Sequence, residues 1–252
     1  MSAADHGQAG ETSTPDGFFR TTHWSVVLAA REEASNGPPR ALELLCRTYW
    51  YPLYAFVRRR GVPVADAQDL TQEFFARLLQ RDFLRNVARE KGKFRTFLLS
   101  SLNNFLVSEW HRGQATKRGG GQQNFVSWDD LQAEERYASE PATEGTPERF
   151  YDQRWAVTVM DQAMTQLREE FQQAGKSTLF DHLKPFLSAE GSRDDYGKAA
   201  APLQMTEGAF SVAVHRFRRR YAQVLRSVVA HTVSAPDEIE AELRCLAQAL
   251  QS

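Results

Sequence analysis

Four arginines and one histidine lie close together near the C-terminal end of the chain, in the stretch EGAFSVAVHRFRRRYAQVL, residues 207–225. Arginine can bridge two acceptors on guanine, and both arginine and histidine can contact phosphates. These residue types indicate binding rather than bond-making chemistry. Charge alone leaves three interpretations open: a helix that reads DNA, a basic amphipathic helix at a membrane, and a core helix with a solvated face.

A second basic segment lies earlier in the chain, between Lys91 and Arg118. It carries six basic residues and one acidic residue, a local charge of +5. Amides and aromatic rings are interleaved with the charges, and the set consists of Lys91, Lys93, Arg95, Asn103, Asn104, Trp110, His111, Arg112, Lys117 and Arg118. Cations neutralise phosphates and flat rings stack on unpaired bases, so this segment is suited to single-stranded DNA.

An acidic surface is predicted just before that segment, in VADAQDLTQEFFARLLQRDFL, residues 64–84. Helical spacing places Asp66, Asp69, Gln72 and Glu73 on one face. The opposite, buried stripe consists of Ala67, Leu70, Phe74, Phe75, Leu78 and Leu79. Most such faces are simply solvated, but the neighbouring basic segment makes a docking role worth testing.

Catalysis finds little support in the sequence. The acid pairs Asp129–Asp130 and Asp194–Asp195 could serve a nuclease, but neither pair has partner ligands at metal-binding spacing. The six histidines show no HxxxH or HExxH spacing, and Cys46 and Cys245 form no CxxC motif. We therefore expect a protein that is not an enzyme, with no metal, no cofactor and two reduced thiols.

Helical periodicity dominates the chain and predicts an all-α fold. We expect helices at about residues 24–33, 40–60, 66–79, 94–111, 155–173, 177–187, 194–203 and 207–233, and a short amphipathic helix after Pro236. Asp66 is the expected cap of its helix. The last helix is expected to bury one face, made of Ile239, Leu243, Leu246 and Leu250.

The segment between the two helical halves is acidic. From Ser127 to Asp152 eight acids face two arginines, a local charge of −6, and two prolines and a glycine favour a mostly irregular linker. The expected organisation is a disordered tail (1–20), a first helical domain (21–118), an acidic linker (119–154), a second helical domain (155–233) and a C-terminal helix (234–252).

The residues around the arginine-rich stretch narrow its interpretation. Its apolar residues recur every three or four positions and form one buried helical face: Phe210, Val214, Phe217, Tyr221, Val224 and Val228. Just upstream, DYGKAAAPLQMT supplies a short helix and a turn, with Thr206 as N-cap. A short helix, a tight turn and a longer helix that begins with polar residues form the helix-turn-helix pattern, whose second helix enters the major groove.

The chain as a whole has 252 residues, a formal net charge of −1 and a pI near 6.6. This balance argues against a general polyanion binder, so nucleic-acid contacts must come from local patches. No apolar run approaches the roughly 18 residues that a membrane span needs. The polar N-terminus lacks the apolar core of a leader. We expect a cytoplasmic protein without membrane contact.

Two blocks of the sequence together resemble a known family. LCRTYWYPLYAFVRRRGVPVADAQDLTQEFFARLL followed by KFRTFLLSSLNNFLVSEWHR resembles region 2 of extracytoplasmic-function (ECF) sigma factors of the sigma-70 family, and YGKAAAPLQMTEGAFSVAVHRFRRRY resembles their region 4. The resemblance covers about residues 21–233, with the helix after Pro236 as an extension. Ala199, Gln204 and Ser211 stand where the family usually has a large aliphatic residue, a glycine and a basic residue.

The resemblance implies a bacterial initiation factor that binds RNA polymerase core and directs it to a promoter. Its contact with the clamp helices of the largest subunit would be Asp66, Asp69, Gln72, Glu73 and Phe74. Its contact with the melted minus-ten strand would be Arg95, Asn103, Asn104, Trp110 and Arg112. Its contact with the minus-thirty-five element would be Thr206, Glu207, Ser211, His215, Arg216, Arg218 and Arg219.

Two further expectations concern partners. The extra segments leave room for regulation, either by an anti-sigma protein or by the acidic C-terminal helix folding back on the basic helix. The alternative function is a helix-turn-helix regulator that binds duplex DNA without being a polymerase subunit. That alternative leaves the acidic face at residues 66–73 and the basic segment unexplained.

Overall fold

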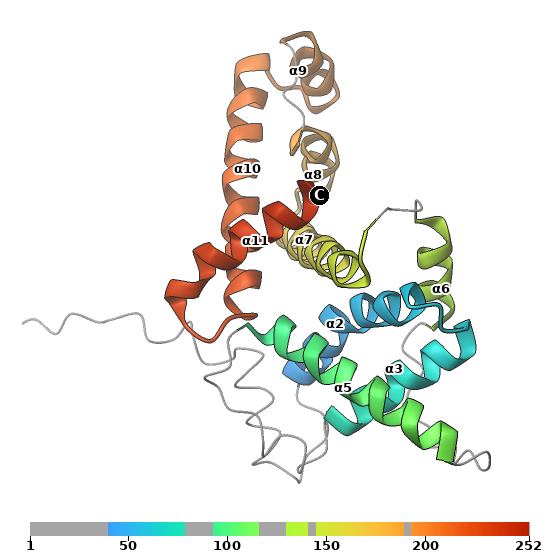
Figure 1. Cartoon of the computed structure of the whole chain (residues 1–252). Coiled ribbons are helices and arrows are strands. Elements are labelled where there is room, and N and C mark those ends of the chain that lie inside the picture. Colours follow the sequence, from blue (N-terminus) through green and yellow to red (C-terminus); the bar gives the residue numbers. More distant parts are fainter. Residues whose placement is uncertain (1–39, 79–92, 116–129, 141–144, 189–192, 252) are drawn as a thin grey trace, which may run out of the picture.

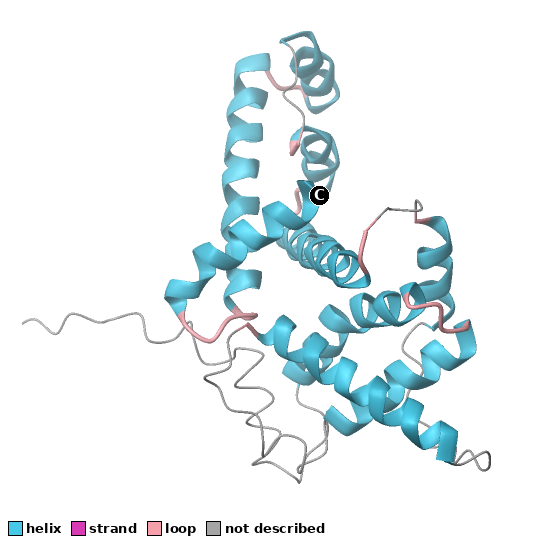
Figure 2. Cartoon of the chain, viewed as in Figure 1, coloured by secondary structure: helices cyan, strands magenta, loops and turns pink. Residues whose placement is uncertain are grey.

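The computed structural model describes residues 40–78, 93–115, 130–140, 145–188 and 193–251. Within these ranges every regular element is a helix (Figure 2), which confirms the expected all-α class. The helix expected at residues 24–33, the N-terminal tail, Lys91, Lys117 and Arg118 lie outside the described residues. None of the described helices combines the length and the apolar character that crossing a membrane requires.

The part of the N-terminal half that the structure describes contains α2 (Arg40–Arg59), α3 (Val64–Leu78) and α5 (Phe94–Ala115) (Figure 1). α2 is followed by Gly61, whose φ of 84° is a left-handed conformation that glycine adopts without steric cost. α3 begins at Val64, so Asp66 lies in its first turn rather than at the expected cap position. A carboxylate in the first turn still interacts favourably with the helix dipole.

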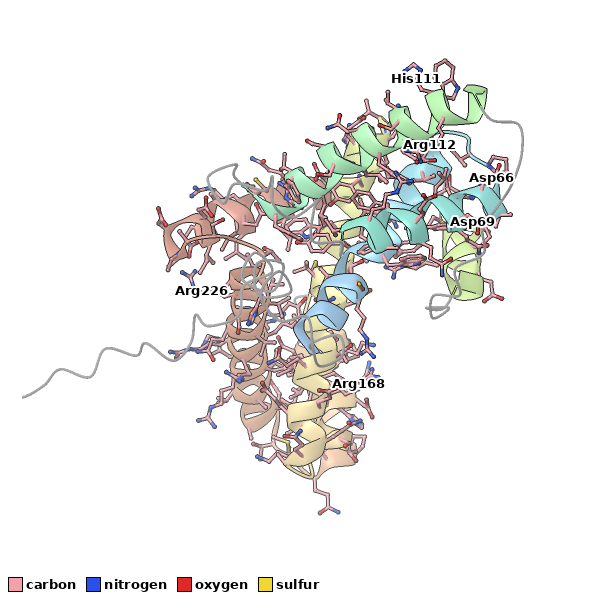
Figure 3. All side chains as sticks on the ribbon, turned by 90° about the horizontal axis from the view of Figure 1, so that it is seen from below. Asp66, Asp69, His111, Arg112, Arg168 and Arg226 are labelled. Carbon is pink, nitrogen blue, oxygen red and sulfur yellow. The ribbon has the colours of Figure 1, made fainter. Side chains whose placement is uncertain are left out.

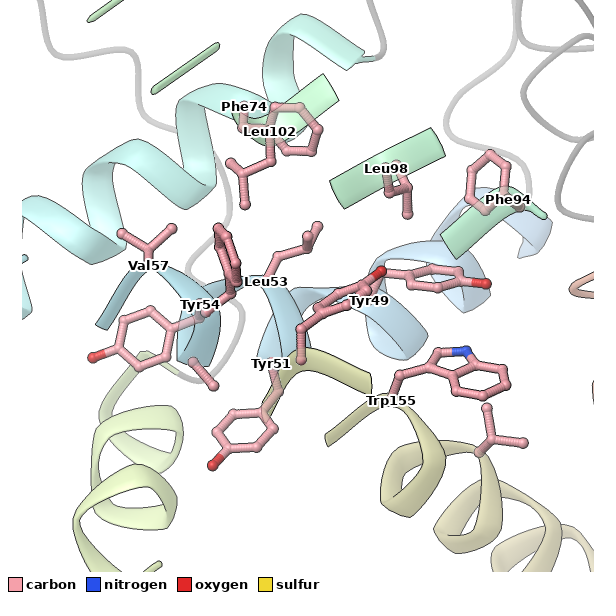
Figure 4. Packing of buried hydrophobic residues seen from close by; sticks show 14 of the residues in the cluster. Tyr49, Tyr51, Leu53, Tyr54, Val57, Phe74, Phe94, Leu98, Leu102 and Trp155 are labelled. Carbon is pink, nitrogen blue, oxygen red and sulfur yellow. The ribbon is translucent and has the colours of Figure 1, made fainter. Parts of the chain in front are cut away.

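Side chains from these helices meet in one hydrophobic core (Figure 4). Tyr49, Leu53, Phe74, Leu98 and Leu102 are all fully buried in it. Phe74 belongs to the apolar stripe predicted for residues 66–79, and Ala67, Phe75 and Leu78 of that stripe are also buried, so the inward face of α3 is confirmed. Complete burial of one such side chain contributes about 1.5–3 kcal/mol to the free energy of unfolding. This core therefore holds the helices that carry the surface residues in place.

The acidic segment between the halves contains more helix than its composition suggested. α6 (Asp130–Ser139) and the start of α7 (Pro147–Gln173) lie within the stretch that we expected to be mostly irregular. Arg58 donates through Nε and Nη2 to the two carboxylate oxygens of Glu134, both at 3.0 Å. The hydroxyl of Tyr54 donates to the same carboxylate. Acidic residues therefore attach α6 to α2.

α7 is the element that joins the two halves of the molecule. Near its start, Tyr151 and Trp155 are buried in the N-terminal core, and farther along, Ala163 and Leu167 are buried in a second core. Its 27 residues span about 40 Å at 1.5 Å per residue. Both halves therefore pack against one continuous helix.

The C-terminal half consists of α8 (Ser177–Leu183), η1 (Lys184–Phe186), α9 (Arg193–Ala200), η2 (Ala201–Leu203) and α10 (Glu207–Ala230). The predicted apolar face of α10 is buried in the second core through Phe210, Val214, Phe217, Tyr221 and Val224. The Phe217 ring meets those of Phe171 and Phe180 edge to face, with both centroid distances 5.6 Å.

The described chain ends with η3 (Pro236–Glu238) and α11 (Ile239–Gln251), which packs on α7 and α10 (Figure 1). The predicted buried face of α11 is confirmed in part. Ile239 and Leu246 are buried and Leu243 packs against the same core, whereas Leu250 is 44% exposed. The fully buried Glu242, which was not predicted, adds a carboxylate to the interface.

Candidate protein and nucleic-acid interfaces

α3 presents an acidic face to solvent. Asp66, Asp69 and Glu73 are exposed and Gln72 is half-buried, as the helical spacing predicted. We refer to these four residues as the acidic face. Carboxylates on a solvent-facing helix can pair with basic side chains of a partner protein and steer its approach.

Phe74 differs from the other residues that the resemblance assigned to polymerase contact. It is fully buried, and its ring centroid lies 5.8 Å from that of Phe105 on α5. Arg77 on α3 strengthens the same helix pair, because its Nη2 lies 2.9 Å from Oε1 of Glu109 on α5. Arg77 also forms an ion pair with Glu73 within α3. Phe74 therefore supports the acidic face from beneath and fixes α3 on α5.

The C-terminal end of α5 is an exposed patch of aromatic, apolar and basic side chains. Trp110 is 63% exposed and Val107 is 52% exposed. The Trp110 ring lies 5.2 Å from that of His111, and Arg112 is also exposed. An exposed indole is a stacking surface for an unpaired base. We call these four residues the exposed end of α5; Val107 joins three residues that the sequence had indicated.

The middle of α5 offers amide groups beside a further arginine. Asn104 is exposed, and Asn103 is half-buried and accepts a hydrogen bond through Oδ1 from Arg60 Nη1 at 2.6 Å. Arg60 comes from the residues just after α2, and no sequence pattern placed it there. The helix pairing therefore adds a cation to the predicted single-strand surface.

Arg95 lies at the opposite end of α5 in a different environment. Its side chain is 11% exposed, and its Nε lies 2.7 Å from Glu242 Oε1 on α11. Arg95 also forms an ion pair with Asp152, and its guanidinium carbon lies 4.7 Å from the ring centroid of Trp155. Burial acts to lower the pKa of Arg95, but the two carboxylates raise it above its usual value. Arg95 is thus engaged inside the protein, apart from the exposed end of α5.

The turn between α9 and α10 has a defined backbone. Pro202 lies in η2, after α9 has ended, where its missing N–H interrupts no α-helical turn. Gln204 adopts a left-handed conformation with φ 55° and ψ 32°. Thr206 Oγ1 accepts a hydrogen bond from the backbone N–H of Ala209 at 3.2 Å, which confirms the predicted N-cap of α10.

The outward face of α10 carries most of the residues predicted to bind duplex DNA. Ser211, His215, Arg216 and Arg219 are exposed, and Glu207 is half-buried. Arg218 points partly inward, because its Nε donates to the carbonyl of Phe186 in η1 at 2.9 Å. Val212 is 49% exposed and adds an apolar side chain beside Ser211, which the charge pattern had not indicated.

The candidate interface residues form two separate groups, one on α3 and α5 and the other on α10. Asp66 and Asp69 on α3 lie at the same end of the molecule as His111 and Arg112 on α5, away from Arg168 and Arg226 (Figure 3). The N-terminal part of α10 lies beside α9, at the far end from α5 (Figure 1). Among the described residues, no group of three or more His, Cys, Asp or Glu side chains could hold a metal ion.

Comparison with known proteins gives a match for the segment that carries the acidic face and the exposed end of α5. Residues 45–116 match the family model described as Sigma-70 region 2. The match runs from α2 through α3 to the end of α5, so it includes the acidic face and the exposed end of α5. No significant match to the chain was found among curated proteins or among solved structures. The match covers less than a third of the chain and shows that residues 45–116 are similar to sigma-70 region 2.

Proposed function

We propose that this chain is an ECF-type sigma factor that binds RNA polymerase core, recognises the minus-thirty-five and minus-ten elements and helps to open the duplex. The observation that carries the proposal is the region 2 match over residues 45–116. The helices of that segment present both an acidic face and an exposed tryptophan, which suit a protein partner and an unpaired base.

The acidic face is the proposed contact with the clamp helices of the largest polymerase subunit. Asp66 and Asp69 are exposed, and Glu73 is exposed although it pairs with Arg77, so a basic surface can reach all three without a rearrangement of α3. The buried Phe74 and the Arg77 bridge to Glu109 hold α3 on α5. Binding of core would therefore also fix the position of the single-strand surface.

The exposed end of α5 is the proposed contact with the melted minus-ten strand. Trp110 offers a ring for stacking, while Arg112 and Asn104 offer donors for phosphates and base edges. Capture of an unpaired base stabilises the open duplex without any covalent step. Arg95 has no part in this contact while it remains paired with Glu242.

The N-terminal part of α10 is the proposed contact with the minus-thirty-five element. The short α9, the turn through η2 and the longer α10 follow one another as in a helix-turn-helix, and the capped start of α10 presents Ser211, His215 and Arg216 to solvent. Arg219 lies one turn farther along and suits a backbone phosphate.

A charge reversal on the acidic face tests the polymerase contact. We expect Asp69→Lys with Glu73→Lys to abolish binding to polymerase core in a pull-down, with an unchanged circular dichroism spectrum. The matched control is Glu169→Lys with Asp181→Lys, because both residues are exposed, lie in the C-terminal half and produce the same change in net charge. Normal core binding by the Asp69/Glu73 variant would exclude the acidic face as the contact.

A duplex-DNA regulator that works without polymerase is the second candidate. The exposed polar start of α10, after a short helix and a turn, favours it. Footprinting on genomic fragments separates the two functions, since a sigma factor protects promoter DNA only together with core. Tight, specific protection by the chain alone would favour the regulator.

A further inference from the structure

A cluster of charged side chains lies where α5, α7 and α11 meet. It consists of Lys93, Arg95, Asp152 and Glu242. We call it the buried ion cluster after Glu242, whose side chain is fully buried, whereas that of Asp152 is 41% exposed. Glu242 has its Oε1 2.7 Å from Arg95 Nε and its Oε2 2.6 Å from Lys93 Nζ. Lys93 Nζ also donates to the sulfur of Cys245 at 2.8 Å. One carboxylate from α11 thus binds both cations at the start of α5.

A buried charge and apolar contacts together set the orientation of α11. The helix buries Ile239 and Leu246 in the core, but it also buries Glu242 completely and leaves Leu250 exposed. Burial of a carboxylate is unfavourable unless it is paired with cations. The orientation therefore also depends on Lys93 and Arg95, and the interface has a charged part beside its apolar part.

The charged part of the α11 interface costs less to separate than its apolar part. Once apart, the carboxylate and its two cations regain their hydration, whereas Ile239 and Leu246 would become exposed to water. Another anion that replaces Glu242 would also keep the cations paired. The buried ion cluster therefore suits an exchange of anions.

Lys93 and Arg95 belong to the same basic segment as the exposed end of α5. A carboxylate and a phosphate present similar oxygens to an arginine or a lysine, and both accept charge-assisted hydrogen bonds. Glu242 therefore occupies donors that a phosphate of a bound strand could use. While α11 is packed in place, Glu242 binds Lys93 and Arg95. The exposed end of α5, which includes Trp110, stays accessible to nucleic acid.

We propose that α11 is an intramolecular latch whose Glu242 occupies a phosphate site formed by Lys93 and Arg95, and that a single DNA strand bound along α5 displaces it. This inference deepens the proposed function and rests on it. The latch lowers the affinity of the free chain for single strands, and its release lengthens the strand-binding surface toward the N-terminal end of α5.

Glu242→Gln is the direct test, because it removes the charge and keeps the size of the side chain. The probe is a fluorescein-labelled single-stranded DNA of about 12 nucleotides and mixed sequence, measured by anisotropy over a range of salt concentrations. We expect the variant to bind at least about fivefold more tightly at low salt. The salt slope should steepen by about 1.4, because each of two new phosphate contacts adds about 0.7.

Glu240→Gln is the matched control. Glu240 lies on the same helix, pairs with Arg226 and is exposed, so its loss changes net charge equally without touching the buried ion cluster. If both variants bind alike, the latch is excluded and the proposed function stands. If neither binds the strand but both bind core, the phosphate site is excluded. If neither the strand nor core binds the wild-type chain, the proposed function itself fails.

A measurement on the wild-type chain covers the case in which Glu242→Gln does not fold. Cys245 is half-buried beside Lys93, so displacement of α11 should expose its thiol. We expect a maleimide to label Cys245 several-fold faster when the same oligonucleotide is present at saturation. Burial raises the pKa of Cys46 to about 11, so its slow labelling serves as an internal reference. An unchanged rate at Cys245 would overturn the latch.

Discussion

The two ends of α5 carry residues with the same predicted role in opposite environments. At the C-terminal end Trp110 is 63% exposed. At the N-terminal end the Arg95 side chain is 11% exposed and lies between two carboxylates and an indole ring. Both residues come from one basic segment, and helical spacing alone does not distinguish them.

The difference shows that a basic segment does not present all of its charges to a ligand. Near Trp110 none of the described helices covers the residue, so the indole remains available. Near Arg95 the start of α7 and α11 converge, and their carboxylates bind the guanidinium. Availability for DNA is therefore decided by which helices pack on each end of α5.

Removal of Arg95 should give the largest effect and would break this comparison most directly. Arg95→Ala leaves Glu242 buried with a single cation, so we expect a loss of about 3–5 kcal/mol in the free energy of unfolding. Urea denaturation followed by circular dichroism measures it. Arg112→Ala at the exposed end serves as control and should stay within about 0.5 kcal/mol. A similar small loss for both variants would contradict the structural contrast.

Removal of the exposed indole should affect binding and not stability. Trp110→Ala should weaken binding to single-stranded DNA by about 1–3 kcal/mol, since one stacked base is lost. Trp110→Phe keeps a flat ring and should retain most of the affinity. Anisotropy titration measures both, and unchanged affinity in Trp110→Ala would remove this residue from the strand-binding surface.

Adjacent arginines on α10 repeat the contrast on a smaller scale. Arg218 donates to the Phe186 carbonyl, so Arg218→Ala should lower stability by about 1 kcal/mol. Arg219 is exposed, so Arg219→Ala should leave stability unchanged and reduce the salt slope of duplex binding by about 0.9. The salt slope is measured from the binding of the chain, assembled with polymerase core, to promoter fragments at several salt concentrations. An unchanged slope would mean that Arg219 contacts no phosphate.

The smallest predicted change in stability comes from a substitution in the turn before α10. Its measurement tests whether the two halves unfold together. Gln204 has a positive φ, so Gln204→Gly should stabilise the chain by about 0.5–1 kcal/mol through relief of backbone strain. Because α7 belongs to both cores, the melting temperature of the whole chain should rise in one transition. A gain confined to the C-terminal half in calorimetry would show that the halves unfold separately.

Local patterns predicted most of the fold. Helical spacing identified the buried faces of α3 and α10, and the side-chain oxygen of Thr206 marked the start of α10. The acidic segment was harder to predict. Its charges indicated an irregular linker, but Glu134 pairs with Arg58, a residue 76 positions earlier in the chain, and no local pattern reports such a distant partner.

In the predicted interfaces too, some features follow from local sequence patterns and others depend on residues that are distant in the sequence. Exposure of Asp66, Asp69 and Glu73 follows from helical periodicity, so the sequence was sufficient for them. Exposure of Trp110 depends on which helices pack on that end of α5. Phe74 was assigned to a partner contact by resemblance, although its place in the apolar stripe predicted burial. The engagement of Arg95 and the exposure of Val212 depend on which elements pack nearby.

The sequence by itself determined the all-α class, the apolar faces and the order of the two helical halves, because these depend on residue types a few positions apart. Only the tertiary structure decided that α7 joins both cores, that α11 buries Glu242 beside Ile239 and Leu246, and that Arg95 is covered. The physical reason is that a buried charge is stable only beside opposite charges. For Glu242 those charges lie on a helix far away in the sequence and are brought close by packing.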